Sequence, residues 1–266
     1  MGIITISRGS YNRGKEIAQK LSEKLGYECI SREILLKASE DFNVPEVKIF
    51  QAIQDAPSVL DRLKHGKKKY VAFIREAFLE HIQKDNVVYH GFAGHYFTKG
   101  LPNILKVRVT ANIDYRINVV MKRDNVSKEK AREILNKIDD ERGKWSTYLY
   151  GIDTRSAGLY DIVLHIDCLE VNGTADILYS LAKRPCFQTT PESKKKLKDM
   201  LVAAKAYSAI VDKYPEAIVK CKDGSVLISV ESSLSVEEKL SGNFENLIKD
   251  IDGVKKVNTF VIPFDT

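Results

Sequence analysis

Apolar and polar positions repeat with two different periods along the first two thirds of the chain, which predicts strands alternating with helices. This alternation favours an α/β fold, with a parallel sheet covered by helices on both faces. Apolar runs typical of buried strands occur at residues 3–6, 27–31, 86–91, 104–110 and 160–167. Helical spacing of apolar residues is found chiefly at 17–25, 32–40, 44–84, 112–122, 127–139 and 173–183.

Two long helical stretches, residues 32–84 and about 112–158, interrupt the alternation. Insertions of this size in a compact domain tend to be lids or substrate clamps. In folds of this kind, ligands bind beyond the carboxyl ends of the strands, so we expect both insertions to serve a site there.

The pattern changes after residue 184. Residues 185–191 (PCFQTTP) are typical of a linker, and a lysine-rich helix is predicted over 192–214. The dipeptide Asp223-Gly224 separates two apolar runs and predicts a β-hairpin, which a further helix and strand follow. We therefore expect a large domain at 1–184, a linker at 185–191 and a small α-β-β-α-β domain at 192–266.

The loop between the first strand and the first helix is the strongest chemical motif. Residues 9–15 (GSYNRGK) fit the spacing G-x-x-x-x-G-K of a phosphate-binding loop. Such a loop holds phosphate with backbone N–H groups, with the positive end of the following helix and with the lysine. Glu16 replaces the Ser or Thr that ligates Mg²⁺ in this motif. An ordinary strand–turn–helix with a solvated Lys15 and Glu16 is the alternative.

Composition and charge narrow the class of protein. The chain has 266 residues, of which 44% are hydrophobic and 29% charged, as in soluble globular proteins. We see no apolar run of membrane-spanning length and no signal peptide, so we expect a cytoplasmic protein. The net charge of +6 arises entirely within residues 1–184 and favours an anionic ligand. No aromatic and basic pattern supports a nucleic-acid partner.

The cysteines and histidines show no metal-ligand spacing. Cys29, Cys168, Cys186 and Cys221 lie far apart and form no C-x-x-C pair. We expect reduced, mostly buried thiols and no protein metal site.

Several runs taken together resemble the cytidylate kinase-like family of bacterial P-loop proteins. They are SRGSYNRGKEIAQKLSEKLG, SREILL, VVYHGFAG, VRVTANIDYRINVVMKRDNVSKEKA, DDERGKWSTYLYG and YDIVLHIDCL, in this order over about residues 1–183. The segment 196–262 is similar to a BON domain through its element order and through DGSVLISV and DGVKKV. BON domains are associated with membrane-surface or partner binding.

The resemblance implies a P-loop three-layer fold with a monophosphate-binding helical insertion and an arginine-bearing lid. It implies transfer of the γ-phosphoryl group of ATP to a nucleoside monophosphate or similar acceptor, with Mg²⁺. By the same resemblance, Lys15, Arg123 and Arg142 are the candidate catalytic residues. The candidate nucleotide-binding residues are Gly9, Ser10, Asn12, Arg13, Gly14, Lys15 and Glu16, and the candidate acceptor-binding residues are Arg32, Gly91 and Arg116.

Three positions depart from the family's pattern. They are Glu16, Ser31 in place of an acidic residue, and Phe92 in place of an arginine expected to hold the acceptor. The alternative function is a catalytically impaired nucleotide-binding sensor whose BON-like domain contacts a partner. A purely structural interaction protein that binds no ATP is a third interpretation.

Several of these side chains could also have ordinary structural roles. Arg123 and Arg142 could pair with Asp124, Asp139 or Asp140 on the surface. Trp145, Tyr148 and Tyr150 could stack on a base or simply pack the lid, and His90 is expected to be a core histidine.

Overall fold

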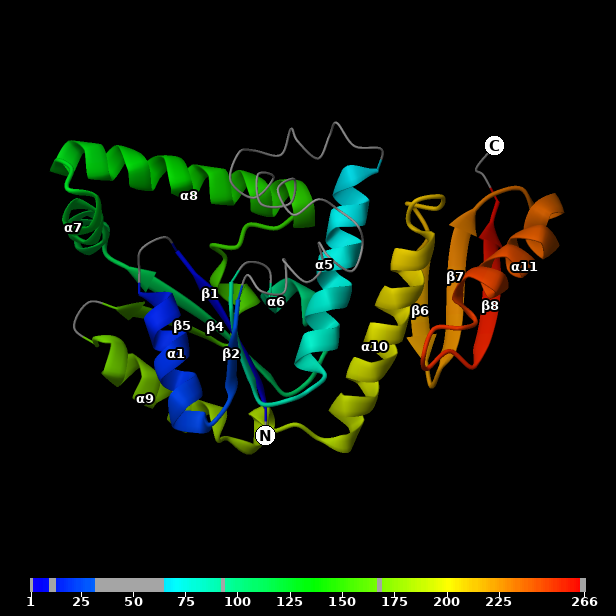
Figure 1. The fold of residues 1–266 in the computed structure, drawn as a ribbon, viewed down its shortest axis with the longest axis horizontal. Helices are drawn as coiled ribbons and strands as arrows, with labels where there is room; N and C mark the ends of the chain where they lie inside the picture. The colour runs from blue at the N-terminus through cyan, green and yellow to red at the C-terminus, as the bar shows by residue number, and fades with distance from the viewer. Residues whose placement is uncertain (1, 10–12, 32–64, 92–93, 167–168, 264–266) are drawn as a thin grey trace. The chain divides into compact units, whose positions relative to one another are not determined.

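A computed structural model describes residues 2–9, 13–31, 65–91, 94–166 and 169–263 of the chain (Figure 1). The chain divides into two compact units. The first combines Met1–Glu33 with Lys84–Thr190, and the second combines Ile34–Gln83 with Pro191–Thr266. Each unit has its own sheet.

A five-stranded parallel sheet forms the centre of the first unit, with the strand order β2-β3-β1-β4-β5. The central strand β1 pairs with β3 on one side and with β4 on the other. The order and direction of the strands confirm the predicted α/β class. Their bounds are β1 (Ile3–Arg8), β2 (Glu28–Ile30), β3 (Val87–His90), β4 (Ile104–Ala111) and β5 (Ile162–Ile166).

Two helices, α1 (Gly14–Leu25) and α9 (Val171–Ala182), cover one face of this sheet (Figure 1). A buried apolar cluster joins them to alternate residues of the strands, among them Ile4 and Ile6 of β1 and Val107 of β4. Because successive residues of a strand point to opposite faces, the residues between them belong to the other face. There β1 contributes Thr5 and Ser7, and β4 contributes Lys106, Arg108 and Thr110. We call this the polar face of the sheet.

The short helix α6 (Gly94–Phe97) lies on the polar face. A Cβ atom added to Gly94 would lie 3.2 Å from the Cβ atom of Thr5, whose side chain points to that face. The segment after β3 therefore packs directly on β1.

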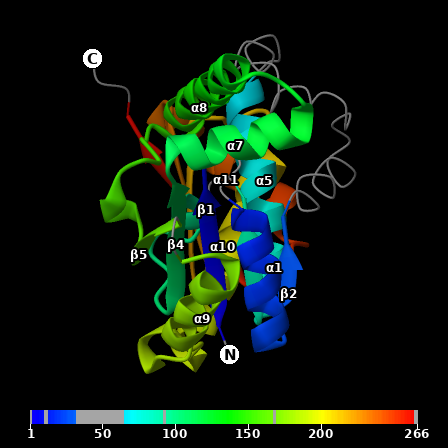
Figure 2. The same cartoon turned by 90° about the vertical axis from the view of Figure 1, so that its left-hand side faces the viewer.

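Helices α7 (Ile113–Asp124) and α8 (Lys128–Tyr150) lie at the carboxyl-end side of the sheet (Figures 1 and 2). Ser127 caps α8, because its side chain accepts the N–H of Lys130 at 3.2 Å. The helix runs well beyond the predicted 127–139. It passes through Gly143 and ends at Gly151, which adopts the left-handed conformation (φ 67°) typical of a helix end.

The second unit has the predicted α-β-β-α-β order after residue 190. In its sheet β7 pairs with β6 antiparallel and with β8 parallel, and α10 and α11 cover one face. Asp223 and Gly224 both have positive φ, 56° and 83°, as a two-residue hairpin of type I′ requires, and this confirms the predicted turn. The elements are α10 (Pro191–Ile210), β6 (Ile218–Lys222), β7 (Ser225–Glu231), η3 (Leu234–Val236), α11 (Glu237–Ile248) and β8 (Lys256–Ile262).

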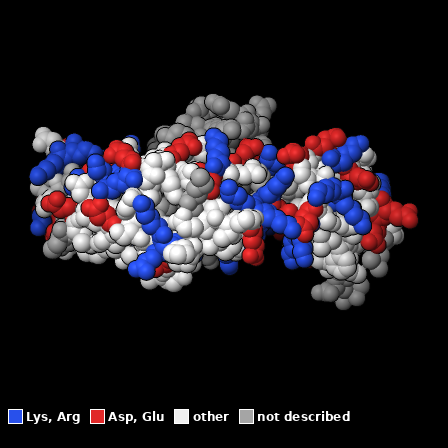
Figure 3. All heavy atoms as spheres, turned by 90° about the horizontal axis from the view of Figure 1, so that it is seen from below, with Lys and Arg blue, Asp and Glu red and all other residues white. Residues whose placement is uncertain are grey.

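Helix α5 (Gly66–Ile82) packs against α10 within the second unit. Lys205 of α10 pairs with Glu80 of α5 at 2.8 Å, and Lys68 and Lys69 pair with Glu216 and Asp212. The lysines at the start of α5 are thus engaged by carboxylates. On the face of the molecule in Figure 3, basic and acidic side chains are interspersed in the same way.

The expectation of mostly buried thiols was wrong. Cys186 is exposed, and Cys29 and Cys221 are only half-buried. Both half-buried cysteines lie on edge strands, β2 and β6, each of which pairs with a described strand on one side only. Desolvation nevertheless raises the pKa of Cys221 to about 11, so its thiol stays protonated. Cys168 lies outside the described residues.

Within the described ranges, no helix combines the length and hydropathy needed to span a bilayer.

Candidate functional site

The two ends of the predicted phosphate-binding loop are held at the carboxyl end of the central strand. The N–H of Gly9 donates to the carbonyl of Val109 on β4 (3.4 Å). Arg13 adopts the left-handed conformation (φ 56°), and α1 begins directly after it at the buried Gly14. The first turn of a helix attracts anions through its unpaired N–H groups and its dipole. Ser10 and Asn12 lie outside the described residues.

The charged residues around the first turn of α1 differ in their partners. Arg13 donates from Nε and Nη2 to Oε2 of Glu16, at 2.9 and 2.5 Å. This hydrogen bond raises the pKa of Arg13 further above its ordinary value. Lys15 is exposed and makes no ion pair or hydrogen bond with any described residue. Arg13 therefore offsets the anionic Glu16, while Lys15 is left as the available cation.

The described residues do not fit a magnesium site of the usual P-loop kind. They contain no group of three or more His, Cys, Asp or Glu side chains that could hold a metal ion. The position of the usual hydroxyl ligand is Glu16, whose carboxylate is already bonded to Arg13.

The helical layer formed by α7 and α8 carries Arg116, a candidate acceptor-binding residue, and Arg123 and Arg142, two candidate catalytic residues. Arg116 donates from Nη2 to both carboxylate oxygens of Asp139, at 2.9 and 2.8 Å, and so ties α7 to α8. Arg123 is bonded to its neighbour Asp124, at 2.5 and 2.6 Å. The surface ion pair that was the structural alternative for Arg123 is therefore observed. Arg142 is half-buried on α8.

The predicted acceptor side is described only in part. The N–H of Gly91 donates to the carbonyl of Ile6 (3.2 Å), which places the end of β3 beside β1. A Cβ atom at position 91 would lie 2.5 Å from the Tyr89 hydroxyl, so any larger residue there would force the Tyr89 side chain to move. Arg32 and Phe92 lie outside the described residues.

The aromatic residues of α8 are partly accounted for by packing. The ring of Tyr150 lies 4.6 Å from that of Tyr96 and 5.6 Å from that of Phe97, which confirms the packing interpretation for Tyr150. His90 is buried on β3, as a core histidine would be.

A polar cluster on the polar face of the sheet was missed by the sequence analysis. The Tyr160 hydroxyl lies 2.8 Å from the carbonyl oxygen of Thr154 and 3.1 Å from the hydroxyl of Ser7. Arg108 donates to the same Thr154 carbonyl. The Thr154 hydroxyl lies 3.1 Å from that of Ser146 near the end of α8. The cluster therefore links β1 and β4 to the segment that follows α8.

His95 of α6 lies against this cluster. Its side chain is 5% exposed, and its ring centroid lies 4.8 Å from that of Tyr160. Neither ring nitrogen has a hydrogen-bond partner among the described residues. Burial, followed by the charges of Arg108 and Lys106, lowers the pKa of His95 to about 4. The imidazole is therefore neutral at pH 7.

The period-2 alternation of β4 was the one available signal for this cluster. It assigns Lys106, Arg108 and Thr110 to the face opposite the apolar residues of the strand. Nothing local connects them with His95 or Tyr160.

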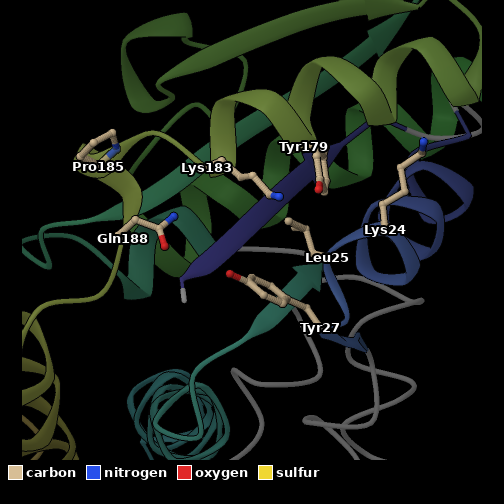
Figure 4. A pocket seen from close by; sticks show the side chains of 7 residues that line it. All are labelled: Lys24, Leu25, Tyr27, Tyr179, Lys183, Pro185 and Gln188. Atoms are coloured by element: carbon tan, nitrogen blue, oxygen red, sulfur yellow. The ribbon is translucent and has the colours of Figure 1, made fainter.

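A separate pocket of about 490 Å³ lies at the opposite end of the first unit, where α1 and α9 end (Figure 4). Lys183 and the two tyrosines point toward one another there, with Nζ of Lys183 4.4 Å from the ring centroid of Tyr179. Lys24 is paired with Asp176 at 2.6 Å. Because the phosphate-binding loop is at the carboxyl end of β1, this pocket is not part of that site. It is lined by Lys24, Leu25, Tyr27, Tyr179, Lys183, Pro185 and Gln188.

A parallel sheet of this strand order, with a G-x-x-x-x-G-K loop between its central strand and the next helix, defines a P-loop kinase fold. The sequence pattern of the cytidylate kinase-like family matches residues 3–167, and the chain belongs to this family.

Two relatives are cytidylate kinases of archaea. The one from Methanosarcina acetivorans is 31% identical over 100 residues, which are 37% of this chain and 54% of that protein. The chain thus spans about half the length of this relative. The one from Sulfolobus acidocaldarius is 24% identical over 183 residues, which are 67% of this chain and 93% of that protein.

A solved structure with the same fold is an uncharacterized protein from Eubacterium ventriosum. It superposes with a TM-score of 0.52 at 18% identity and covers 67% of this chain and 96% of its own. This likeness concerns the fold alone.

Proposed function

We propose that the chain is an ATP-dependent phosphotransferase, which moves the γ-phosphoryl group of ATP to a nucleoside monophosphate or a similar small acceptor. The observation that carries this proposal is Lys15, an exposed lysine without a described partner on the first turn after the central strand. Membership of the cytidylate kinase-like family supports the same reaction.

The residues around the loop have distinct tasks in this proposal. Phosphoryl transfer needs positioning and charge stabilisation more than covalent chemistry from the protein. Gly9, whose own N–H is donated to Val109, would open the loop, and the N–H groups of Ser10, Asn12 and Gly14 would cradle the donor phosphates. Lys15 would stabilise charge on the transferring group. Arg13 keeps Glu16 from repelling that charge.

ATP supplies the phosphoryl group, and Mg²⁺, when bound to it, supplies charge neutralisation. Arg32 and Gly91 would lie on the acceptor side, with Arg116, Arg123 and Arg142 acting from the helical layer. Arginine suits these positions because it stays charged and binds phosphate oxygens bidentately.

A catalytically impaired nucleotide sensor is the second candidate. It is favoured by the carboxylates that engage Arg116 and Arg123, and by Glu16 at the hydroxyl position. In that case ATP would bind and little transfer would follow.

The test is ADP release from ATP, with and without Mg²⁺, across a panel of nucleoside monophosphates. In a kinase, Lys15→Met should lower acceptor-dependent turnover roughly 100- to 1000-fold. Lys20→Met, on the same helix and paired only with Glu23 at 3.4 Å, is the matched control and should turn over normally. If the chain binds ATP but shows no acceptor-dependent turnover, the kinase proposal is wrong and the nucleotide sensor is the better interpretation.

We further propose that residues 192–266 form a BON-like module that contacts a partner surface. The sheet face not covered by α10 and α11 carries exposed apolar side chains, with Ile218 55% and Phe260 56% exposed. Lys220 lies two residues from Ile218 on the same face of β6. In co-sedimentation with anionic vesicles, Phe260→Ser should lower binding if the surface is a membrane. If the wild type and Phe260→Ser bind the vesicles equally, or if neither binds, the surface does not contact membranes and its partner would be a protein.

A further inference from the structure

Arg108, on the polar face of the sheet, is a half-buried arginine without a carboxylate bound to it among the described residues. It lies on β4 directly opposite Ser7 of β1. Its one hydrogen bond to a described residue is the one that it donates to the carbonyl of Thr154. A guanidinium carries five N–H donors, so most of its binding capacity is unused by described atoms.

The neighbouring charges do not neutralise Arg108. Lys106, on the same face of β4, is held by Asp161, with Nζ 3.1 Å from Oδ1. Asp153 lies close enough for Arg108 to contribute to lowering its pKa, but its carboxylate is bonded to Arg155 at 3.0 Å. Arg108 is thus set apart from the arginines of α7, which are bound by Asp124 and Asp139.

His95 adds a second, independent observation. Both of its ring nitrogens lack a described partner although the side chain is 5% exposed. A buried polar group without a partner is unfavourable and rare, so it points to a group that binds there. His95 and Arg108 both contact the ring of Tyr160, with 4.8 Å between the two ring centroids and 5.7 Å from Cζ of Arg108.

The cluster also lies where an acceptor is expected. Ser7 stands two positions before Gly9, the first residue of the phosphate-binding loop, α6 follows Gly91, and Thr154 follows the end of α8. The cluster therefore contains residues that adjoin each of the three parts of the predicted site. These parts are the phosphate-binding loop, the acceptor strand β3 and the helical layer.

We propose that Arg108 and His95 bind the phosphate group of the acceptor, and that Tyr160 is the residue that positions Arg108. This inference rests on the proposed phosphotransfer. Arg108 would supply the positive charge that Phe92 cannot supply at the position where the family's pattern has an arginine. The neutral imidazole would donate its one N–H to a phosphate oxygen.

Anion binding here changes the titration of His95. Desolvation and the cations Arg108 and Lys106 lower the pKa of His95 to about 4, and a bound phosphate would offset those cations. The pKa of His95 should therefore rise when the acceptor binds.

The first test measures binding of CMP, cytidine and inorganic phosphate to the full chain. Arg108→Met should weaken binding of CMP roughly 10- to 100-fold and leave binding of cytidine and ATP unchanged. Arg184→Met is the matched control, because Arg184 is exposed at the far end of α9 and should bind all ligands normally. Weaker binding of inorganic phosphate as well would show that the phosphate group itself is recognised. Normal CMP binding by Arg108→Met would overturn the proposal.

The second test needs no substitution of Arg108. In a histidine-labelled chain, the NMR signal of His95, assigned from its loss in His95→Gln, should titrate at higher pH with CMP than without it. An unchanged titration in the presence of bound CMP would also overturn the proposal.

The two proposals can fail separately. If Arg108→Met keeps acceptor-dependent ADP release with an unchanged KM for the acceptor, the proposed phosphate site is wrong and the proposed phosphotransfer stands. If CMP binding depends on Arg108 but no ADP is released, the proposed phosphotransfer is wrong and the proposed phosphate site stands.

Discussion

Two regions of the first unit, the helical layer of α7 and α8 and the polar face of the sheet, use their charged side chains in opposite ways. In the helical layer, Arg116 and Arg123, two site residues expected from the family resemblance, are each bonded to a carboxylate. On the polar face, Arg108 has no such partner, and the buried ring of His95 makes no hydrogen bond to a described residue. Whether an arginine can bind a ligand therefore depends on the residues around it in space. A sequence motif does not show these residues.

This difference predicts where stability depends on pH. The ordinary pKa of histidine is 6.5 and that of His95 in the fold is about 4, so between these values the unfolded chain binds more protons. The free energy of unfolding should therefore fall as pH drops from 6.5 to 4, by up to about 3 kcal/mol. Above pH 6.5 both states are neutral at this residue and the effect vanishes.

His95→Gln should remove this part of the pH dependence. Denaturant unfolding at pH 7 and pH 4.5 can be followed by the fluorescence of Trp145, the single tryptophan, which belongs to the first unit. The groups that face His95 are Arg108 and Lys106 of β4 and the ring of Tyr160. Identical pH profiles for His95→Gln and the wild type would contradict the comparison.

The next effect concerns the hydroxyl of Tyr160. Tyr160→Phe leaves the Thr154 carbonyl with Arg108 alone and removes the 3.1 Å contact to the Ser7 hydroxyl. We expect a loss of about 1–2 kcal/mol in the free energy of unfolding. Tyr179→Phe, whose hydroxyl has no described partner, should cost less in the same measurement. Equal losses for the two variants would mean that the polar cluster adds no stability.

The ion pair between α7 and α8 should be weaker still. Arg116 is 12% exposed but Asp139 is 39% exposed, so solvent screens one end of the pair. A double-mutant cycle with Arg116→Met and Asp139→Asn should give a coupling of about 1 kcal/mol that falls at high salt. A coupling that does not respond to salt would show that the pair is better shielded than its exposure indicates.

Much of the fold could be predicted from the sequence because its cues are local. The apolar runs located the strands to within about two residues, and Asp223-Gly224 located the hairpin. The end of α8 was missed because Gly143 weakens the helical pattern, although a single glycine costs a helix only about 1 kcal/mol.

The polar cluster could not be predicted in the same way. His95 lies 65 positions before Tyr160, and only the parallel pairing of β1, β4 and β5 brings their segments together. Arg108 carried no motif, while Arg116 and Arg123 did. The partners that engage these two arginines, one of them 23 positions away, became visible only in the structure.

The smallest expected effect on stability is at Arg123, and it separates the two roles open to that residue. Arg123 pairs with the adjacent Asp124 and its side chain is 51% exposed, so the pair orders no second element. Arg123→Met should therefore leave the thermal midpoint of the first unit unchanged. If Arg123 also acts on the transferring phosphoryl group, acceptor-dependent turnover should still fall roughly 10- to 100-fold. Arg132→Met, also on the helical layer and 50% exposed, should change neither quantity. An Arg123→Met variant with full turnover would leave Arg123 as a surface ion pair and move the search for the lid's catalytic charge to Arg142.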